Sequence, residues 1–429
     1  MLTVNKYLEN NDSEIFNIPY TWSQDNSIVK YDTVTIYDDN HGVGSLADVT
    51  EYSFTTNNED IFYLPTSSYL LATVKLTKAD DSAYADGDIV TIDNNAFNIF
   101  KDARLYIDDQ ELERMDYVGM STLLYNITKY TFSEQNGIRE SQLINIDRDF
   151  NREYVKQCGR EIEVLLPVRK LFPLFHQLTH VFRGVKFRIV LTKNDNNRVI
   201  YKWTKPAEGG NPEVLAPVDG KFVISKMVWK MPYVEPSLPM QSKLENLLAK
   251  NSTFNFKYQA TSVYKVIPPK NDEIRISLSS TIHKPTNIFV AFQKLKRGTN
   301  QTDSYMAFDH MDAEYVNCEI NSKQFPDVNT VCNFGTKKVQ EVYNKFLQAC
   351  SNGVTYEDSY RNFINYFPIF HIDVSHHPPA LYENSNYPNI VINAKFRNVP
   401  VDDYAMFVII YNIREVSLQL DQKKMRIIK

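Results

Sequence analysis

The densest group of residues that could do chemistry is His371-Ile-Asp373-Val-Ser-His376-His377-Pro-Pro379. On a β-strand His371 and Asp373 project to the same side, and imidazole and carboxylate groups both bind metals. A metalloenzyme could therefore use His371, Asp373 and His376. Such a site normally adds a Glu and a further His from other strands in a Gly-rich setting, which this sequence lacks. We favour a strand end closed by two prolines, and predict no metal site and no cofactor.

The other catalytic patterns are incomplete. His176 and His180 have the spacing of the HExxH zinc motif, but Gln177 stands where a glutamate should activate water. Gly42-Val-Gly44-Ser45 is not the GxSxG nucleophile pattern, and no Gly-rich loop carries a phosphate-binding lysine. The acidic run Asp108–Glu113 is best interpreted as a hairpin with a solvated face. This chemistry favours a structural or binding protein over an enzyme.

The composition is that of an ordinary globular chain with two or three domains. It has 429 residues, of which 43% are hydrophobic and 23% charged. The net charge of -5 argues against coating of nucleic acid by the body of the protein. The basic end, Lys423–Lys429, could contact nucleic acid or an acidic neighbour, although a solvated tail is the simpler interpretation.

Nothing in the chain indicates secretion or a membrane anchor. No apolar run approaches the ~18 residues of a membrane span, and the N-terminus lacks the apolar core of a signal peptide. We therefore expect the protein to be synthesised inside the cell. The cysteines form no CxxC pair, which predicts free buried thiols; they are Cys158, Cys318, Cys332 and Cys350.

Strand patterns recur along the whole chain. Aromatic residues make up 13% of it, and 39 Asn stand against 13 Gly, as expected of strands separated by Asn/Asp loops. Hydrophobic and polar residues alternate with period two in Leu71–Thr77, Val185–Thr192 and Ile390–Arg397, which predicts strands with one buried face. Ile288–Phe292 is continuously apolar and predicts a strand buried on both faces. Phe407–Leu420 changes phase at Arg414-Glu415, which predicts a bulge or a sharp bend there.

Helical patterns are few. Apolar residues recur every three or four positions in Asp116–Thr131 and in Lys338–Ser351, and Ser242 with Glu245 predicts the start of a short third helix. Each half of the chain therefore has several strands, then one helix, then more strands. This shared layout predicts an all-β protein of two sandwiches related by duplication.

A proline-rich segment, Met231–Met240, separates the halves. Proline cannot donate to a β-ladder, so we expect the sheet to end there. We therefore divide the chain into a polar N-terminal arm (1–45), a first sandwich (46–231) and a second sandwich (232–429), with a crossover at about 231–240.

Six segments occur in a characteristic order along residues 45–429. They are Pro65–Leu76, Val90–Asp109, Tyr117–Tyr130 with the following Glu140–Leu143, Arg183–Asn194, Ile224–Pro239 and Phe407–Gln422. This order resembles the double jelly-roll major capsid proteins of the Polinton/Maverick and adintovirus group of double-stranded DNA viruses, whose relatives include virophages. The region Leu295–Tyr356 departs from the family pattern.

The resemblance implies two consecutive eight-stranded jelly rolls, each with a short inserted helix. It also implies homotrimers with large, aromatic-rich interfaces, in which six vertical jelly rolls form a pseudo-hexagonal, hexon-like capsomer. Such capsomers tile an icosahedral virion shell together with penton and minor capsid proteins. The alternative is a β-sandwich viral spike or lectin-like binding module, whose aromatic residues would be ligand platforms.

Overall fold

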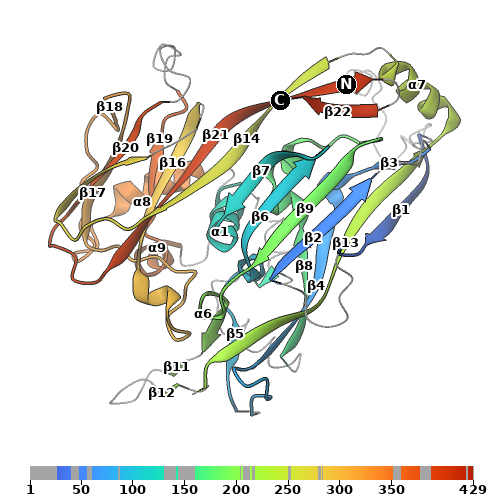
Figure 1. Ribbon diagram of the computed structural model, residues 1–429. Helices are drawn as coiled ribbons and strands as arrows, with labels where there is room; N and C mark the ends of the chain where they lie inside the picture. The colour runs from blue at the N-terminus through green and yellow to red at the C-terminus, as the bar shows by residue number, and fades with distance from the viewer. Residues whose placement is uncertain are drawn as a thin grey trace, which may run out of the picture.

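The protein consists of two β-sandwiches that lie side by side and are joined at one end by helix α7, Leu238–Leu248 (Figure 1). The computed structural model describes residues 27–39, 48–55, 60–85, 87–129, 142–143, 160–202, 204–205, 213–214, 218–249, 253–278, 282, 284–350, 359–376, 388–421 and 424–428. None of the described helices is long and apolar enough to cross a membrane.

The first sandwich, called roll 1, has two antiparallel layers with the orders β1-β13-β4-β8 and β2-β9-β6-β7. The short β3 (Phe62–Tyr63) adds to β13. If the eight principal strands are counted along the chain, the layers read 1-8-3-6 and 2-7-4-5, which is the winding of a jelly roll. The strands are β1 (Ile28–Ile36), β2 (Val49–Thr55), β4 (Tyr69–Lys78), β6 (Phe100–Ile107), β7 (Gln110–Asp116), β8 (Glu161–Pro167), β9 (Lys186–Lys193) and β13 (Gly220–Pro236).

The second sandwich, called roll 2, repeats this winding. Its layers are β14-β21-β16-β19 and β15-β20-β17-β18, which again read 1-8-3-6 and 2-7-4-5. The fold expected from the sequence, two consecutive jelly rolls, is therefore confirmed. The strands are β14 (Thr253–Val266), β15 (Glu273–Leu278), β16 (Pro285–Lys294), β17 (Ala313–Ile320), β18 (Lys323–Phe325), β19 (Phe370–Asp373), β20 (Ile390–Phe396) and β21 (Tyr404–Asp421), with β22 (Lys424–Ile428) added to β21.

The inserted helices occupy matching places. Helix α1 (Val118–Lys129) follows the fifth principal strand of roll 1, and α8 (Gln340–Ala349) follows the fifth of roll 2. Helix α7 begins before the expected Ser242, because Pro239 stands in its first turn, where a missing N–H costs nothing. The remaining elements are α4 (Val168–Leu171), α5 (Pro173–Gln177), α6 (Asn196–Val199), α9 (Ser359–Asn365), η3 (Pro65–Ser67), η4 (Ala96–Ile99), η6 (Leu295–Gly298), β5 (Val90–Ile92), β10 (Ile200–Lys202), β11 (Thr204–Lys205) and β12 (Glu213–Val214).

The predicted strand faces are largely correct. In β4 the side chains of Ala72, Val74 and Leu76 are buried, as the alternation requires. All five residues of Ile288–Phe292 in β16 are buried. On one face Phe292 packs against Phe396 of β20 inside the sandwich, and on the other Phe289 packs against His371 and Tyr411. The run Asp108–Glu113 does contain a hairpin, with Asp108 and Asp109 at positive φ between β6 and β7.

The N-terminal boundary differs from the expected one. Strand β1 lies within the segment 1–45 that the sequence assigned to a polar arm, and it pairs with β13 from Trp229 to Pro236. The sheet therefore continues past Met231. Prolines are tolerated there because the ladder between β13 and β4 has already ended at Lys230. The first half of β1 is exposed on both faces, so it shows no alternation that could reveal a strand.

The end of the chain also differs. The register between β21 and β14 is unbroken through Arg414-Glu415, which contradicts a bulge, the first of the two expected irregularities. The strand is buried on both faces up to Asn412, so Ile409 and Tyr411 point inward without a bulge, whereas Ile413 is 38% exposed and Val416 is buried. The segment Lys424–Ile428, which was interpreted as a solvated tail, pairs with β21 as strand β22.

Candidate functional site: the contact between the two rolls

The histidine cluster is built into the fold of roll 2. His371 lies on β19, and its Nδ1 and Nε2 lie 2.8 Å from the Lys345 carbonyl and the Asn287 amide oxygen. Burial lowers the pKa of His371. Asp373 accepts hydrogen bonds from the backbone and hydroxyl of Ser375, and His376 is exposed. The described residues contain no group of three His, Cys, Asp or Glu side chains placed to hold a metal ion.

The HExxH-like pattern has a structural explanation. Gln177, at the end of α5, donates from Nε2 to the Gln259 carbonyl at 3.0 Å and accepts from the Gln259 N–H at 2.9 Å. Gln259 lies on β14, an outer strand of roll 2. The side chain of Gln177 therefore pairs with the edge of β14 as a neighbouring strand would. Gly42-Val-Gly44-Ser45 lies outside the described residues.

The predicted free thiols are confirmed for Cys318, Cys332 and Cys350, which are buried and unbridged. Burial raises the pKa of each to about 12, so none is an activated thiolate. Cys158 lies outside the described residues.

Helix α1 fills the space between the rolls (Figure 1). Every residue from Val118 to Thr128 is buried. Its polar side chains are satisfied locally, for example by the Thr122 hydroxyl, which donates to the Val118 carbonyl. The Thr128 hydroxyl also lies 2.7 Å from that of Tyr411 on β21. The ring of Tyr125 meets the same tyrosine edge-on. The helix thus belongs to the cores of both rolls.

Beside α1, a buried carboxyl group faces roll 2. Glu113 on β7 is 5% exposed and accepts hydrogen bonds from the Leu174 N–H at 3.3 Å. Tyr258 of β14 and Arg414 of β21 lie next to it. Burial raises the pKa of Glu113 to about 7, although Arg414 favours the charged form. Arg414 also donates to the Leu112 carbonyl at 3.3 Å, which ties β21 to β7.

A second set of bonds holds the segment 299–306 of roll 2 against roll 1. The Asp93 carboxylate accepts from the Ser304 hydroxyl at 2.8 Å and from the Met306 N–H at 2.9 Å. The side chain of Gln301 bonds both the N–H and the carbonyl of Gly220, at 2.5 and 2.8 Å. Buried hydrogen bonds of this kind are costly to break. This pairing could not be predicted from the sequence, because an Asp or Gln that becomes buried has no pattern that distinguishes it from an ordinary loop residue.

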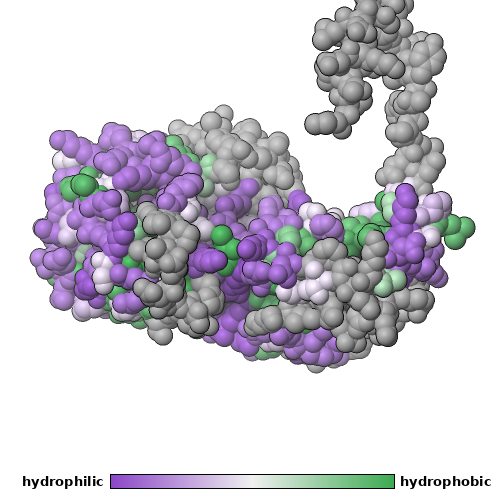
Figure 2. All heavy atoms as spheres, turned by 90° about the horizontal axis from the view of Figure 1, so that it is seen from above, coloured by the Kyte–Doolittle hydropathy of each residue, from purple (hydrophilic) through white to green (hydrophobic). Residues whose placement is uncertain are grey.

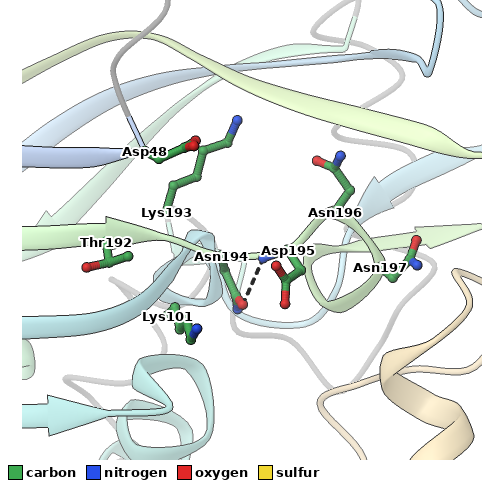
Figure 3. A pocket seen from close by; sticks show the side chains of 8 residues that line it. All are labelled: Asp48, Lys101, Thr192, Lys193, Asn194, Asp195, Asn196 and Asn197. Carbon is green, nitrogen blue, oxygen red and sulfur yellow. Dashed lines mark hydrogen bonds between the residues drawn. The ribbon is translucent and has the colours of Figure 1, made fainter.

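Two open pockets lie at the loops. The first, of about 490 Å³, is lined by Asp48, Lys101 and the segment 192–197, and its side chains are polar (Figure 3). Its asparagines are already bonded to the protein. Asn194 accepts from the Asp195 N–H at 2.9 Å, Asn196 accepts from the Phe222 N–H at 3.3 Å, and Asn197 donates to the Thr299 carbonyl at 3.2 Å. We assign no ligand to this pocket. The second, of about 430 Å³, lies in roll 2 between residues 309–312 and 398–402, next to α9.

One face of the molecule is mostly polar where the structure describes it. On the face in Figure 2 hydrophilic residues predominate, and hydrophobic ones form separate small areas. Among the described residues, exposed apolar side chains include Val29 and Tyr31 on β1, which are 72% and 58% exposed. Val328 and Val331, which follow β18, are 80% and 58% exposed. Apolar side chains on two separate surfaces of one protein can mark contacts with other molecules.

The fold and the contact between the rolls define a double jelly-roll protein. Solved structures share this fold along nearly the whole chain. The Sputnik virophage structure aligns with a TM-score of 0.59 and 10% identity, over 96% of this chain and 91% of the other. The mavirus major capsid protein gives 0.52 and 11%, over 100% and 95%. A PBCV-1 virus capsid chain gives 0.59 and 10%, over 95% and 98%. No protein-family model and no curated protein sequence matches the chain.

Proposed function

We propose that this protein is a major capsid protein that trimerises into pseudo-hexagonal capsomers, which tile an icosahedral virion shell. The observation that carries the proposal is the repetition of one eight-strand winding in both halves of the chain. One chain then supplies two similar wall units, and three chains supply six. Each layer of a roll ends in an edge strand on either side, and contacts between copies in a shell can cover such edges.

The rigid contact between the rolls supports this role. Helix α1 and the segment 299–306 bond each roll to the other through buried groups, so one chain behaves as a single block. A capsid wall needs blocks whose shape does not change between copies. The similarity to the Sputnik, mavirus and PBCV-1 capsid structures agrees with this role.

In this proposal the protein acts as a building block rather than an enzyme, and it resides in the virion. Its partners are further copies of itself, neighbouring capsomers, and penton and minor capsid proteins. We infer that the boundary between the two units lies at α7 in the chain. Roll 1 then begins at β1 and roll 2 at β14.

Light scattering and negative-stain imaging of the purified chain test the proposal. We expect a species of about 150 kDa, three times the 49.9 kDa of one chain, with a hexagonal outline. A chain that stays monomeric at all concentrations would contradict the capsomer. It would then favour the spike or lectin-like binding module, for which glycan-array binding is the next measurement.

A further inference from the structure

The contact between the rolls is heterologous, because each roll contributes a different surface. Roll 1 contributes its fifth strand, β7, with α1 and α5. Roll 2 contributes its first and last strands, β14 and β21. A heterologous contact leaves one surface of each kind free at the two ends of the pair.

The repeated winding identifies these free surfaces. The roll 2 counterparts of β7 and α1 are β18 and α8, and the roll 1 counterparts of β14 and β21 are β1 and β13. In roll 2 the edge of β14 is bonded by Gln177 of roll 1. In roll 1 the matching edge strand, β1, pairs with β13 alone among the described residues.

Both free surfaces carry the exposed apolar side chains described above. On β1 these are Ile28, Val29 and Tyr31, and after β18 they are Val328 and Val331. An open, nine-residue edge strand with apolar side chains is normally protected or used for pairing. Single exposed apolar residues need no explanation, but these lie on the two surfaces that the repeat selects.

We propose that β1 of one copy docks against β18 and residues 326–331 of a second copy. This contact repeats between chains the one that β14 makes with β7 within the chain. The proposal rests on the proposed trimeric capsid function and specifies how its subunits meet. A heterologous contact closes a ring of three when each copy is turned by a third of a turn from the last, and every roll in that ring contacts two others.

The pocket in roll 2 extends the same correspondence. In roll 1, the connection after the third strand contains Asp93 and the connection after the seventh strand ends at Gly220. Both residues form hydrogen bonds with the segment 299–306 of roll 2. In roll 2, the same two connections supply 309–312 and 398–402, which line the cavity of about 430 Å³. The segment of roll 1 that corresponds to 299–306 is 79–85, after β4. In the ring, 79–85 of the neighbouring copy reaches this cavity.

Charge placed on either surface should break the ring. Y31D and V328D are each expected to weaken association by at least about 30-fold, the loss of one central contact residue. Each variant keeps one intact surface. An equimolar mixture of the two should therefore form dimers of about 100 kDa, twice the chain mass, while each variant alone is monomeric. An isologous contact would not be restored by mixing.

One control variant and one alternative variant complete this test. I267D alters an apolar residue that is 64% exposed and lies on neither surface, and it should leave the assembly of the wild type unchanged. If the charged variants fail to fold, as seen by circular dichroism, a V29C/V328C double variant replaces them. It should give disulfide-linked dimers and trimers on a non-reducing gel, whereas V29C alone should not.

The outcomes separate this inference from the capsid function. If the wild type is trimeric and Y31D, V328D and their mixture are trimeric too, the docking contact is overturned and the capsomer stands. If the wild type is monomeric at every concentration, both are overturned. Monomeric single variants that dimerise when mixed establish the contact.

Discussion

Helices α1 and α8 occupy the same place in two copies of one winding, yet their surroundings differ. Every residue of α1 from Val118 to Thr128 is buried, whereas α8 buries only Val342 and Phe346 fully and exposes polar residues along its other side. The burial differs because α1 contacts both rolls, whereas α8 packs on its own roll. Tyr411 of roll 2 packs against α1 at Tyr125 and Thr128, while α8 packs on β19 of its own roll. The comparison shows that two helices at the same place in the winding can differ in burial. The burial depends on whether the other roll lies beside the helix.

Removing apolar volume from each helix is the strongest test of this difference. Leu124 of α1 is 2% exposed, so L124A should lower the free energy of unfolding by about 3 kcal/mol through lost burial and a cavity. Leu347 of α8 is only half-buried, so L347A should cost about 1 kcal/mol. Urea unfolding at one protein concentration measures both. Equal losses would contradict the idea that α1 belongs to two cores.

The contact beside α1 should also respond to pH. The pKa of Glu113 is raised by burial to about 7, from an ordinary value of 4.5. The folded state therefore holds this proton more tightly, so its contribution is complete below about pH 4.5 and is lost as the pH rises through 7. Unfolding should cost about 3 kcal/mol less at pH 8 than at pH 4.5 on account of this group.

The variant E113Q tests this dependence, because it removes the titrating group and keeps an acceptor for the Leu174 N–H. Its stability between pH 4.5 and 8 should be flatter than that of the wild type by about 3 kcal/mol. E341Q changes an exposed carboxylate on α8 and is the matched control. A pH profile of E113Q that equals that of the wild type would rule out Glu113 as the source.

A glycine in α1 provides a further test of how tightly this helix is packed. An alanine usually stabilises a helix interior by about 1 kcal/mol relative to glycine. At Gly119 of α1, however, the new Cβ would lie 2.8 Å from Cβ and Cγ of Asn98, which is held by Asn194. G119A should therefore destabilise the protein by about 2 kcal/mol. Thermal unfolding measures the sign, and a stabilised G119A would show that η4 can move away from α1.

The smallest expected effect concerns the bond between the rolls at Thr128 and Tyr411. T128V keeps the shape of the side chain and removes the hydroxyl, which should cost about 1 kcal/mol. A double-mutant cycle with Y411F isolates the pair, and we expect a coupling energy of about 1 kcal/mol. Additive losses would mean that the two hydroxyls do not depend on each other.

The sequence predicted most of the features that depend on one strand or helix alone. The alternation in β4 and β20, the doubly buried Ile288–Phe292 and the places of α1 and α8 all follow from local periodicity. It failed where one roll or strand covers another. The apparent phase change at Arg414 reflects two buried faces rather than a bulge.

Strand β1 was missed for the opposite reason, because its first half is exposed on both sides and has no periodic signal. The residues that join the rolls were missed as well. Glu113, Asp93 and Gln301 are polar residues whose burial depends on partners far away in the chain. Local sequence patterns do not indicate such distant partners. The strand order that repeats in the two rolls, by contrast, identifies the surfaces that contact each other.

The pairing of β1 with β13 also determines when the chain can fold during translation. Ile28 pairs with Pro236, so roll 1 cannot close until more than two hundred residues have emerged from the ribosome. Pairings this distant are slow to form and leave strand edges open in the meantime. The strands of roll 2 all follow those of roll 1 in the chain. The first roll can thus be complete before β14 is made, and the nascent second roll finds a finished surface to fold against.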